Sequence, residues 1–168
     1  MNSVTNVVIA GLGGMGVIKA SDILAACAFR AGHDVKKSEI HGMSQRGGSV
    51  TSDIRYGQQV FSPMVPEGEA DFLVALDESQ VEHNRYALRP KGILITPHPL
   101  AVIHGPMNEL DDRDLPLTSR NFNVAILGML SVHLDFEPDH WEGAIAAHVP
   151  RHTQAQNLEV FRLGRRFA

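Results

Sequence analysis

A ten-residue segment concentrates side chains that can do chemistry. It reads Glu39, Ile40, His41, Gly42, Met43, Ser44, Gln45, Arg46, Gly47 and Gly48, so an acid, an imidazole, a hydroxyl, an amide and a guanidinium occur close together. Arginine can clamp a carboxylate or phosphate with two N–H donors, and histidine can transfer a proton near neutral pH. We therefore take His41 and Arg46 as candidates that assist catalysis, and the whole segment as an active-site or partner loop. The other interpretation is an interface loop whose polar groups satisfy one another and a partner's backbone.

A glycine turn is the second candidate. Gly11, Leu12, Gly13, Gly14, Met15 and Gly16 follow an expected strand and precede an expected helix, where a turn can present backbone amides to a phosphate. Gly11, Gly13, Gly14, Met15 and Gly16 are therefore candidate cofactor-binding residues. Asp34 or Glu39 follows at the distance expected of a ribose-binding acid, which suggests a nicotinamide or flavin nucleotide. The alternative is that the glycines only permit a tight turn and close packing of helix on strand.

The elements that must position these residues follow from hydrophobic periodicity. Alternating strands and helices predict an α/β fold: one doubly wound, mostly parallel sheet with helices on both faces and a hairpin insertion, in a single domain over residues 1–168. Prolines and acidic residues predict an irregular connection over 97–117 with at most one short strand. The expected strands are 4–10, 34–40, 49–56 paired with 58–61 as the hairpin, 71–76 and 93–96, and the expected helices are 14–31, 78–88, 123–134, 141–147 and 153–165.

Composition excludes several classes of protein. The 168 residues are 43% hydrophobic and 20% charged, typical of a folded globular chain, and the formal charge of −4 gives no basic field for nucleic acid or an anionic membrane. Cys27 is the one cysteine, so the chain can supply neither a disulfide nor an iron–sulfur cluster, and no histidine pair has the spacing of a metal site. We expect no bound metal and a cytoplasmic location, because no leader or long apolar run precedes the first strand.

Several motifs in order resemble a known family. They are Gly-x-Gly-Gly-x-Gly-Val over 11–17, Glu-x-His-Gly-Met-Ser-Gln-Arg-Gly-Gly-Ser-Val over 39–50, Ser62-Pro63 and Ala70-Asp71, with weaker matches over 123–128 and 157–164. Together they resemble the gamma subunit, or fused gamma domain, of 2-oxoacid (pyruvate/ketoisovalerate):ferredoxin oxidoreductases. The sequence of the 39–50 segment is most similar to that of the beta subunit of the indolepyruvate type. One position departs from the pattern, because Met15 stands where the family usually has glutamine.

The resemblance implies a small subunit that is not active alone and binds no cofactor by itself. A large partner subunit would hold thiamine diphosphate, magnesium and 4Fe-4S clusters, decarboxylate an aryl-2-oxoacid such as indolepyruvate, and pass electrons to ferredoxin, with coenzyme A as a possible acyl acceptor. This chain would shape or close that active site. Two alternatives stay open: a self-sufficient oxidoreductase that binds NAD or a flavin at the glycine turn, and an assembly module with no contact to the active site.

Overall fold

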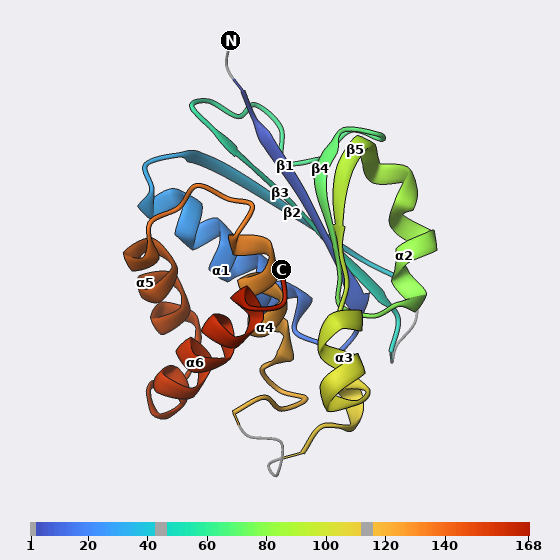
Figure 1. Cartoon of the computed structure of the whole chain (residues 1–168). Coiled ribbons are helices and arrows are strands. Elements are labelled where there is room, and N and C mark those ends of the chain that lie inside the picture. The colour runs from blue at the N-terminus through green and yellow to red at the C-terminus, as the bar shows by residue number, and fades with distance from the viewer. Residues whose placement is uncertain (1–2, 43–46, 112–115) are drawn as a thin grey trace.

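The computed structural model describes residues 3–42, 47–111 and 116–168. Its centre is a five-stranded sheet in the order β2-β3-β1-β4-β5 (Figure 1). The strands are β1 (Thr5–Leu12), β2 (Asp34–His41), β3 (Ser49–Gly57), β4 (Ala70–Ala75) and β5 (Leu88–Ile95).

β1 is the central strand, as its valine-rich sequence predicted. It pairs in parallel with β4, with Val8 opposite Leu73, and antiparallel with β3, with Val8 opposite Asp53. Val7, Val8, Ile9 and Ala10 are all at most 2% exposed, so both faces of β1 are covered. A continuous apolar run is what such a position requires.

The sheet differs from the prediction in two respects. The strand β3 pairs with both β2 and β1, and Glu39 of β2 lies opposite Ser52. Residues 58–61, the predicted partner of β3, form no strand. The hairpin is therefore β2–β3, and the predicted partner was wrong. Both pairings of β3 are antiparallel, and those of β4 with β1 and β5 are parallel, so the sheet is mixed rather than mostly parallel. The α/β class and the single sheet are confirmed.

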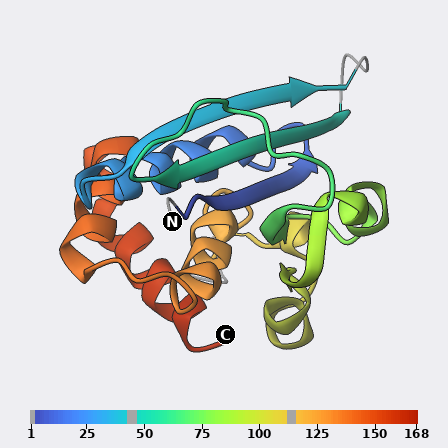
Figure 2. The same cartoon turned by 90° about the horizontal axis from the view of Figure 1, so that it is seen from above.

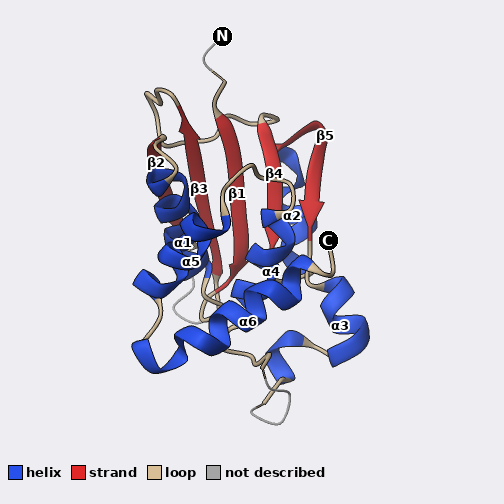
Figure 3. Cartoon of the chain, turned by 60° about the vertical axis from the view of Figure 1, so that its left-hand side comes forward, coloured by secondary structure: helices blue, strands red, loops and turns tan. Residues whose placement is uncertain are grey.

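Helices cover both faces, as predicted. Val7 and Ile9 of β1 face the larger core, which α1, α4, α5 and α6 complete, whereas Val8 and Ala10 face a smaller cluster with Ala87. Figure 2 shows the large helical layer on one side of the curved sheet, and Figure 3 shows α2 on the opposite side, behind β4 and β5. The helices are α1 (Val17–Arg30), α2 (Ser79–Asn84), α3 (His98–His104), α4 (Phe122–Ser131), α5 (Pro138–His148) and α6 (Gln154–Arg165), with short 3-10 turns at Arg85–Ala87, Met107–Glu109 and Arg151–Thr153.

Two differences involve proline. The helix α3 occupies part of the segment predicted to be irregular. Pro99 does not prevent this helix, because it lies in the first turn, where a proline costs no intrahelical N–H bond. Strand β5 begins at Leu88 and continues through Pro90, which an edge strand tolerates. Within the described ranges, no helix is long and apolar enough to cross a membrane.

Candidate functional site

The glycine turn joins the end of the central strand to α1. Gly14 and Gly16 have φ angles of 90° and 81°, a region that favours glycine, and the Met15 amide closes the turn on the Leu12 carbonyl at 3.1 Å. A Cβ on Gly16 would collide with the side-chain amide of Asn123, which donates a hydrogen bond of 3.0 Å to the Gly16 carbonyl oxygen. Close packing against Asn123 therefore requires glycine at position 16, whether or not the turn also binds a ligand.

Gly47 and Gly48, which precede β3, lie directly against this turn. The backbone amide of Gly13 donates a hydrogen bond of 2.9 Å to the carbonyl oxygen of Gly48, and the Gly42 amide donates one of 2.8 Å to Ser49. The second bond closes the base of the loop. Met43, Ser44, Gln45 and Arg46, including the candidate Arg46, lie outside the described residues. The structure thus brings together the ends of both candidate segments, which are far apart in the sequence.

A groove continues from the glycine turn across the carboxyl end of the sheet. Its central depression, about 590 Å³, is lined by the turn, Lys19, Arg120 and Phe122. Lys19 and Arg120 also line an adjoining depression of about 520 Å³ that extends toward His152. Met15 and Asn108 line both the central depression and a third depression of about 280 Å³. Two cations beside a turn of backbone amides make a surface suited to an anionic ligand.

Met15 forms part of the wall of this groove. It is half-buried and packs against the main hydrophobic core, while lining both the central and the smaller depression. A thioether in this position contributes apolar, adaptable contact and no hydrogen-bond donor. The turn therefore offers backbone amides and an apolar side chain.

Glu39 and His41 are linked to α1 through Lys37. The Lys37 ammonium contacts Asp22 of α1 and lies 2.6 Å from Glu39, whose other oxygen is 3.9 Å from His41 Nε2. Burial lowers the pKa of Lys37, but its hydrogen bonds and ion pairs with Asp22 and Glu39 outweigh burial and raise the pKa overall. Because alternate residues of a strand share a face, Lys37, Glu39 and His41 all lie on the side that α1 covers.

The acid expected to bind a ribose is not beside the glycine turn. Asp34 lies opposite Gly57, at the end of the sheet where β1 begins at Thr5, and its carboxylate bonds Lys36 and the Val60 amide. Those bonds lower the pKa of Asp34, the Lys36 hydrogen bond most of all. Eight residues of strand span roughly 25 Å, so Asp34 is far from the turn. Glu39 is two strands away from β1 and is paired with Lys37.

The residues do not fit a thiamine–magnesium or iron–sulfur site of the chain's own. Cys27 is fully buried in the core, and burial raises the pKa of its thiol to about 12. Among the described residues, no group of three histidine, cysteine or acidic side chains could hold a metal ion.

Sequence reasoning missed Arg120 as a groove residue. Arg120 precedes α4 and meets the glycine turn only through the fold. The polar run Thr118-Ser119-Arg120-Asn121 before an apolar helix indicates a helix start, but it does not indicate that this start lies beside the glycine turn.

Comparison with known proteins decides the family. A family model described as pyruvate ferredoxin/flavodoxin oxidoreductase matches residues 6–167. The chain belongs to this family. It is a small subunit of the 2-oxoacid:ferredoxin oxidoreductase type, part of a multi-subunit oxidoreductase with larger subunits. A similar protein is the indolepyruvate oxidoreductase subunit IorB of Thermococcus kodakarensis, 32% identical over 95% of this chain and 93% of its own length.

Solved structures of the oxidoreductase family share the fold. The gamma subunit of a keto/oxoacid ferredoxin oxidoreductase from Geobacter sulfurreducens superposes with a TM-score of 0.77 at 22% identity, over 98% of each chain. A 2-oxoglutarate:ferredoxin oxidoreductase from Magnetococcus marinus gives a TM-score of 0.82 at 21% identity, over the whole of this chain and 31% of that one. The fold of this chain therefore occurs both as a separate subunit and within a longer chain.

Proposed function

We propose that this chain is the small subunit of a thiamine-diphosphate-dependent oxidoreductase acting on an aryl-2-oxoacid such as indolepyruvate, and that it closes the active site of a large cofactor-bearing subunit. The observation that carries the proposal is the Gly13–Gly48 hydrogen bond, which joins the two motif segments into one surface beside the groove. The IorB protein of T. kodakarensis, named for indolepyruvate, supports the substrate class.

Three residues of the loop have proposed roles at the subunit interface. Residues 39–48 face the partner; Arg46 binds the substrate carboxylate, and His41 holds a proton near the reacting carbonyl. Lys37 pairs with Glu39, and Glu39 in turn holds the His41 ring in position. Thiamine diphosphate and 4Fe-4S clusters, held by the partner, would supply the decarboxylation and electron-transfer chemistry. This chain orients the substrate and excludes water.

Coenzyme A is the proposed acyl acceptor, with its phosphates on the groove. Lys19 and Arg120 give that groove two cations next to the glycine turn, and phosphates bind well to such cations. Coenzyme A is named among the ligands of the M. marinus enzyme, which shares the fold. Arg120→Ala in the complex should raise KM for coenzyme A about tenfold with little change in KM for the oxoacid.

The first experiment is affinity purification of the tagged native chain from its own cells, with iron and thiamine assays of what co-purifies. A large partner containing both, with arylpyruvate-dependent reduction of ferredoxin, supports the proposal. A colourless chain recovered alone would contradict it. Arylpyruvate oxidation by the purified chain with a dye acceptor would also contradict it.

Two further measurements separate the alternatives. Arg46→Ala should abolish most turnover while the complex stays intact, with Arg85→Ala, an exposed arginine paired with Glu82, as the matched control; unchanged turnover would favour an assembly module. A bound yellow flavin, or micromolar NAD binding that requires the glycine turn, would favour the nucleotide-binding enzyme. The position of Asp34 supports the subunit hypothesis over that alternative.

A further inference from the structure

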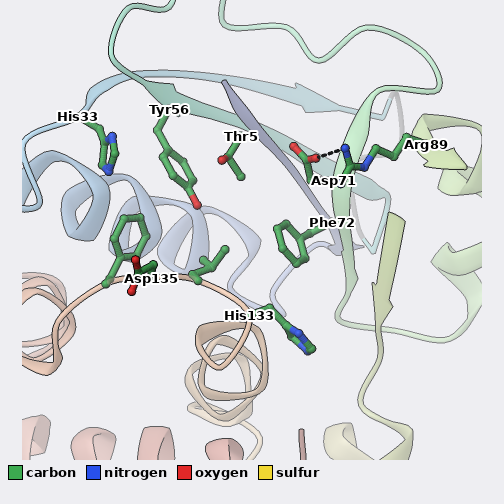
Figure 4. A pocket seen from close by; sticks show the side chains of 10 residues that line it. Thr5, His33, Tyr56, Asp71, Phe72, Arg89, His133 and Asp135 are labelled. Carbon is green, nitrogen blue, oxygen red and sulfur yellow. Dashed lines mark ion pairs between the residues drawn. The ribbon is translucent and has the colours of Figure 1, made fainter. Parts of the chain in front are cut away.

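A second pocket lies at the end of the sheet opposite the glycine turn. It has a volume of about 400 Å³ and forms between the strands and the loop that joins α4 to α5. Thr5, Tyr56 and Phe72 line it from three strands, and Asp135 and Phe136 line it from the loop (Figure 4). Because Thr5 begins β1 and the glycine turn follows its end, the two sites are roughly 25 Å apart along the strand.

The inner wall of this pocket is aromatic and built into the core. Tyr56 and Phe72 are 6% and 8% exposed, and the Tyr56 ring lies 5.2 Å from that of Phe136 and 5.3 Å from that of His33. In Figure 4, Tyr56 and Phe72 project from the sheet toward the loop that carries Asp135. Such a wall favours a flat apolar group, and the negative faces of aromatic rings attract a cation.

The charges at the rim leave one carboxylate uncompensated. Asp71 is satisfied by Arg89, at 3.0 Å, and by the Asn6 amide, at 2.7 Å. Asp135 is exposed and has no hydrogen bond or ion pair within the part of the chain that the structure describes. With the histidines neutral, two acids against one arginine give the lining a formal charge of −1. The pocket therefore favours a ligand that carries a positive charge.

An organic cation fits this pocket better than a metal ion. Metal ions require several oxygen, nitrogen or sulfur ligands, and no group of three such side chains is found among the described residues. A primary ammonium needs only one carboxylate and gains from nearby aromatic faces. A pocket of this volume also accommodates a ring system beside the charged group.

We propose that this pocket binds a small aromatic molecule with a protonated amine, its ammonium on Asp135 and its ring against the Tyr56–Phe72–Phe136 wall. Two sources share this chemistry: an aromatic amine, and an aromatic amino acid, whose carboxylate could also use the half-exposed Arg89. The site is separate from the surface proposed to meet the large subunit. The proposed ligand site can therefore be tested independently of the proposed function.

The test is titration of the isotope-labelled full chain with tryptamine, tryptophan and indole-3-acetate, followed by amide NMR. We expect saturable shifts with both ammonium compounds at residues 33, 56 and 133–136, and none with the acetate. Asp135→Asn should weaken tryptamine binding about tenfold, whereas Asp139→Asn, an exposed acid in the first turn of α5, should leave it unchanged.

The tryptophan arm distinguishes the two sources. Tighter binding of tryptophan than of tryptamine would identify the amino acid, and weaker binding would identify the amine; either supports an ammonium site. No saturable shift at these residues up to about 10 mM would overturn the proposal. Equal affinity of the wild type and Asp135→Asn, or indole-3-acetate binding as tightly as tryptamine, would also overturn it.

Discussion

The side-chain amide of Asn123 donates a hydrogen bond of 3.0 Å to the carbonyl oxygen of Gly16, although 107 positions separate the two residues. Asn123 is 1% exposed and lies in the first turn of α4, and Gly16 ends the glycine turn. The bond therefore fixes the turn on the helical layer.

Gly16→Ala should destabilise the chain more than Gly14→Ala does. Both glycines have positive φ, so either alanine costs about 1 kcal/mol of conformational energy, but only a Cβ at Gly16 collides with Asn123. We expect a loss of about 2–3 kcal/mol in the free energy of unfolding for Gly16→Ala and about 1 kcal/mol for Gly14→Ala. Urea unfolding followed by circular dichroism measures both. Equal losses would show that the Asn123 contact adds nothing.

Local patterns were sufficient to predict most of the elements and the two motif segments. The apolar run of β1, the periodicity of α1 and the glycines between them are local signals, and the structure has this strand, turn and helix, although β1 continues to Leu12 and α1 begins only at Val17. The partner of β3 was wrong because strand pairing depends on contacts that alternation alone does not specify. The groove around Arg120 could not be predicted, since α4 meets the turn only in the folded chain.

Two glycines allow α4 and α6 to pack closely. A Cβ on Gly128 would collide with the Phe161 carbonyl, and one on Gly164 would collide with the Ala125 carbonyl, so backbone rather than flexible side chains would have to move. Gly128→Ala or Gly164→Ala should each cost about 3 kcal/mol or more of stability. Differential scanning calorimetry should show a Tm lower by about 10 °C.

Gly143→Ala is the matched control for these helix substitutions. A Cβ there meets only the end of the Arg30 side chain, which can turn away, and alanine favours a helix by about 1 kcal/mol over glycine. Its Tm should be unchanged or higher. A Tm loss as large as that of Gly128→Ala would show that helix glycines in this chain are needed for a reason other than close packing.

Stability should fall at alkaline pH. Burial raises the pKa of the Cys27 thiol from 9.0 to about 12 and that of the Tyr56 hydroxyl from 10.0 to about 12. Above about pH 9 the unfolded chain loses these protons while the folded chain keeps them, so the unfolded state is favoured as the pH rises toward 12. Each group contributes up to about 1.4 kcal/mol per pH unit. Urea unfolding between about pH 8 and pH 11 measures the slope, and Cys27→Ala should make it shallower; an unchanged slope would contradict the assignment to Cys27.

Lys37→Met should destabilise the chain more than the neighbouring Lys36→Met. The Lys37 side chain is 22% exposed and pairs with both Asp22 and Glu39, so its removal leaves two carboxylates without a cation, at a cost of about 1 kcal/mol. Lys36 is 43% exposed and pairs with Asp34 alone, so its loss should cost less than about 0.5 kcal/mol. Because the pKa of Lys37 is raised in the fold, its contribution is fully present below pH 10.5 and is lost as the pH rises through that raised pKa. Urea unfolding near neutral pH compares the two variants, and equal losses would show that the link from α1 to Glu39 and His41 does not stabilise the base of the loop.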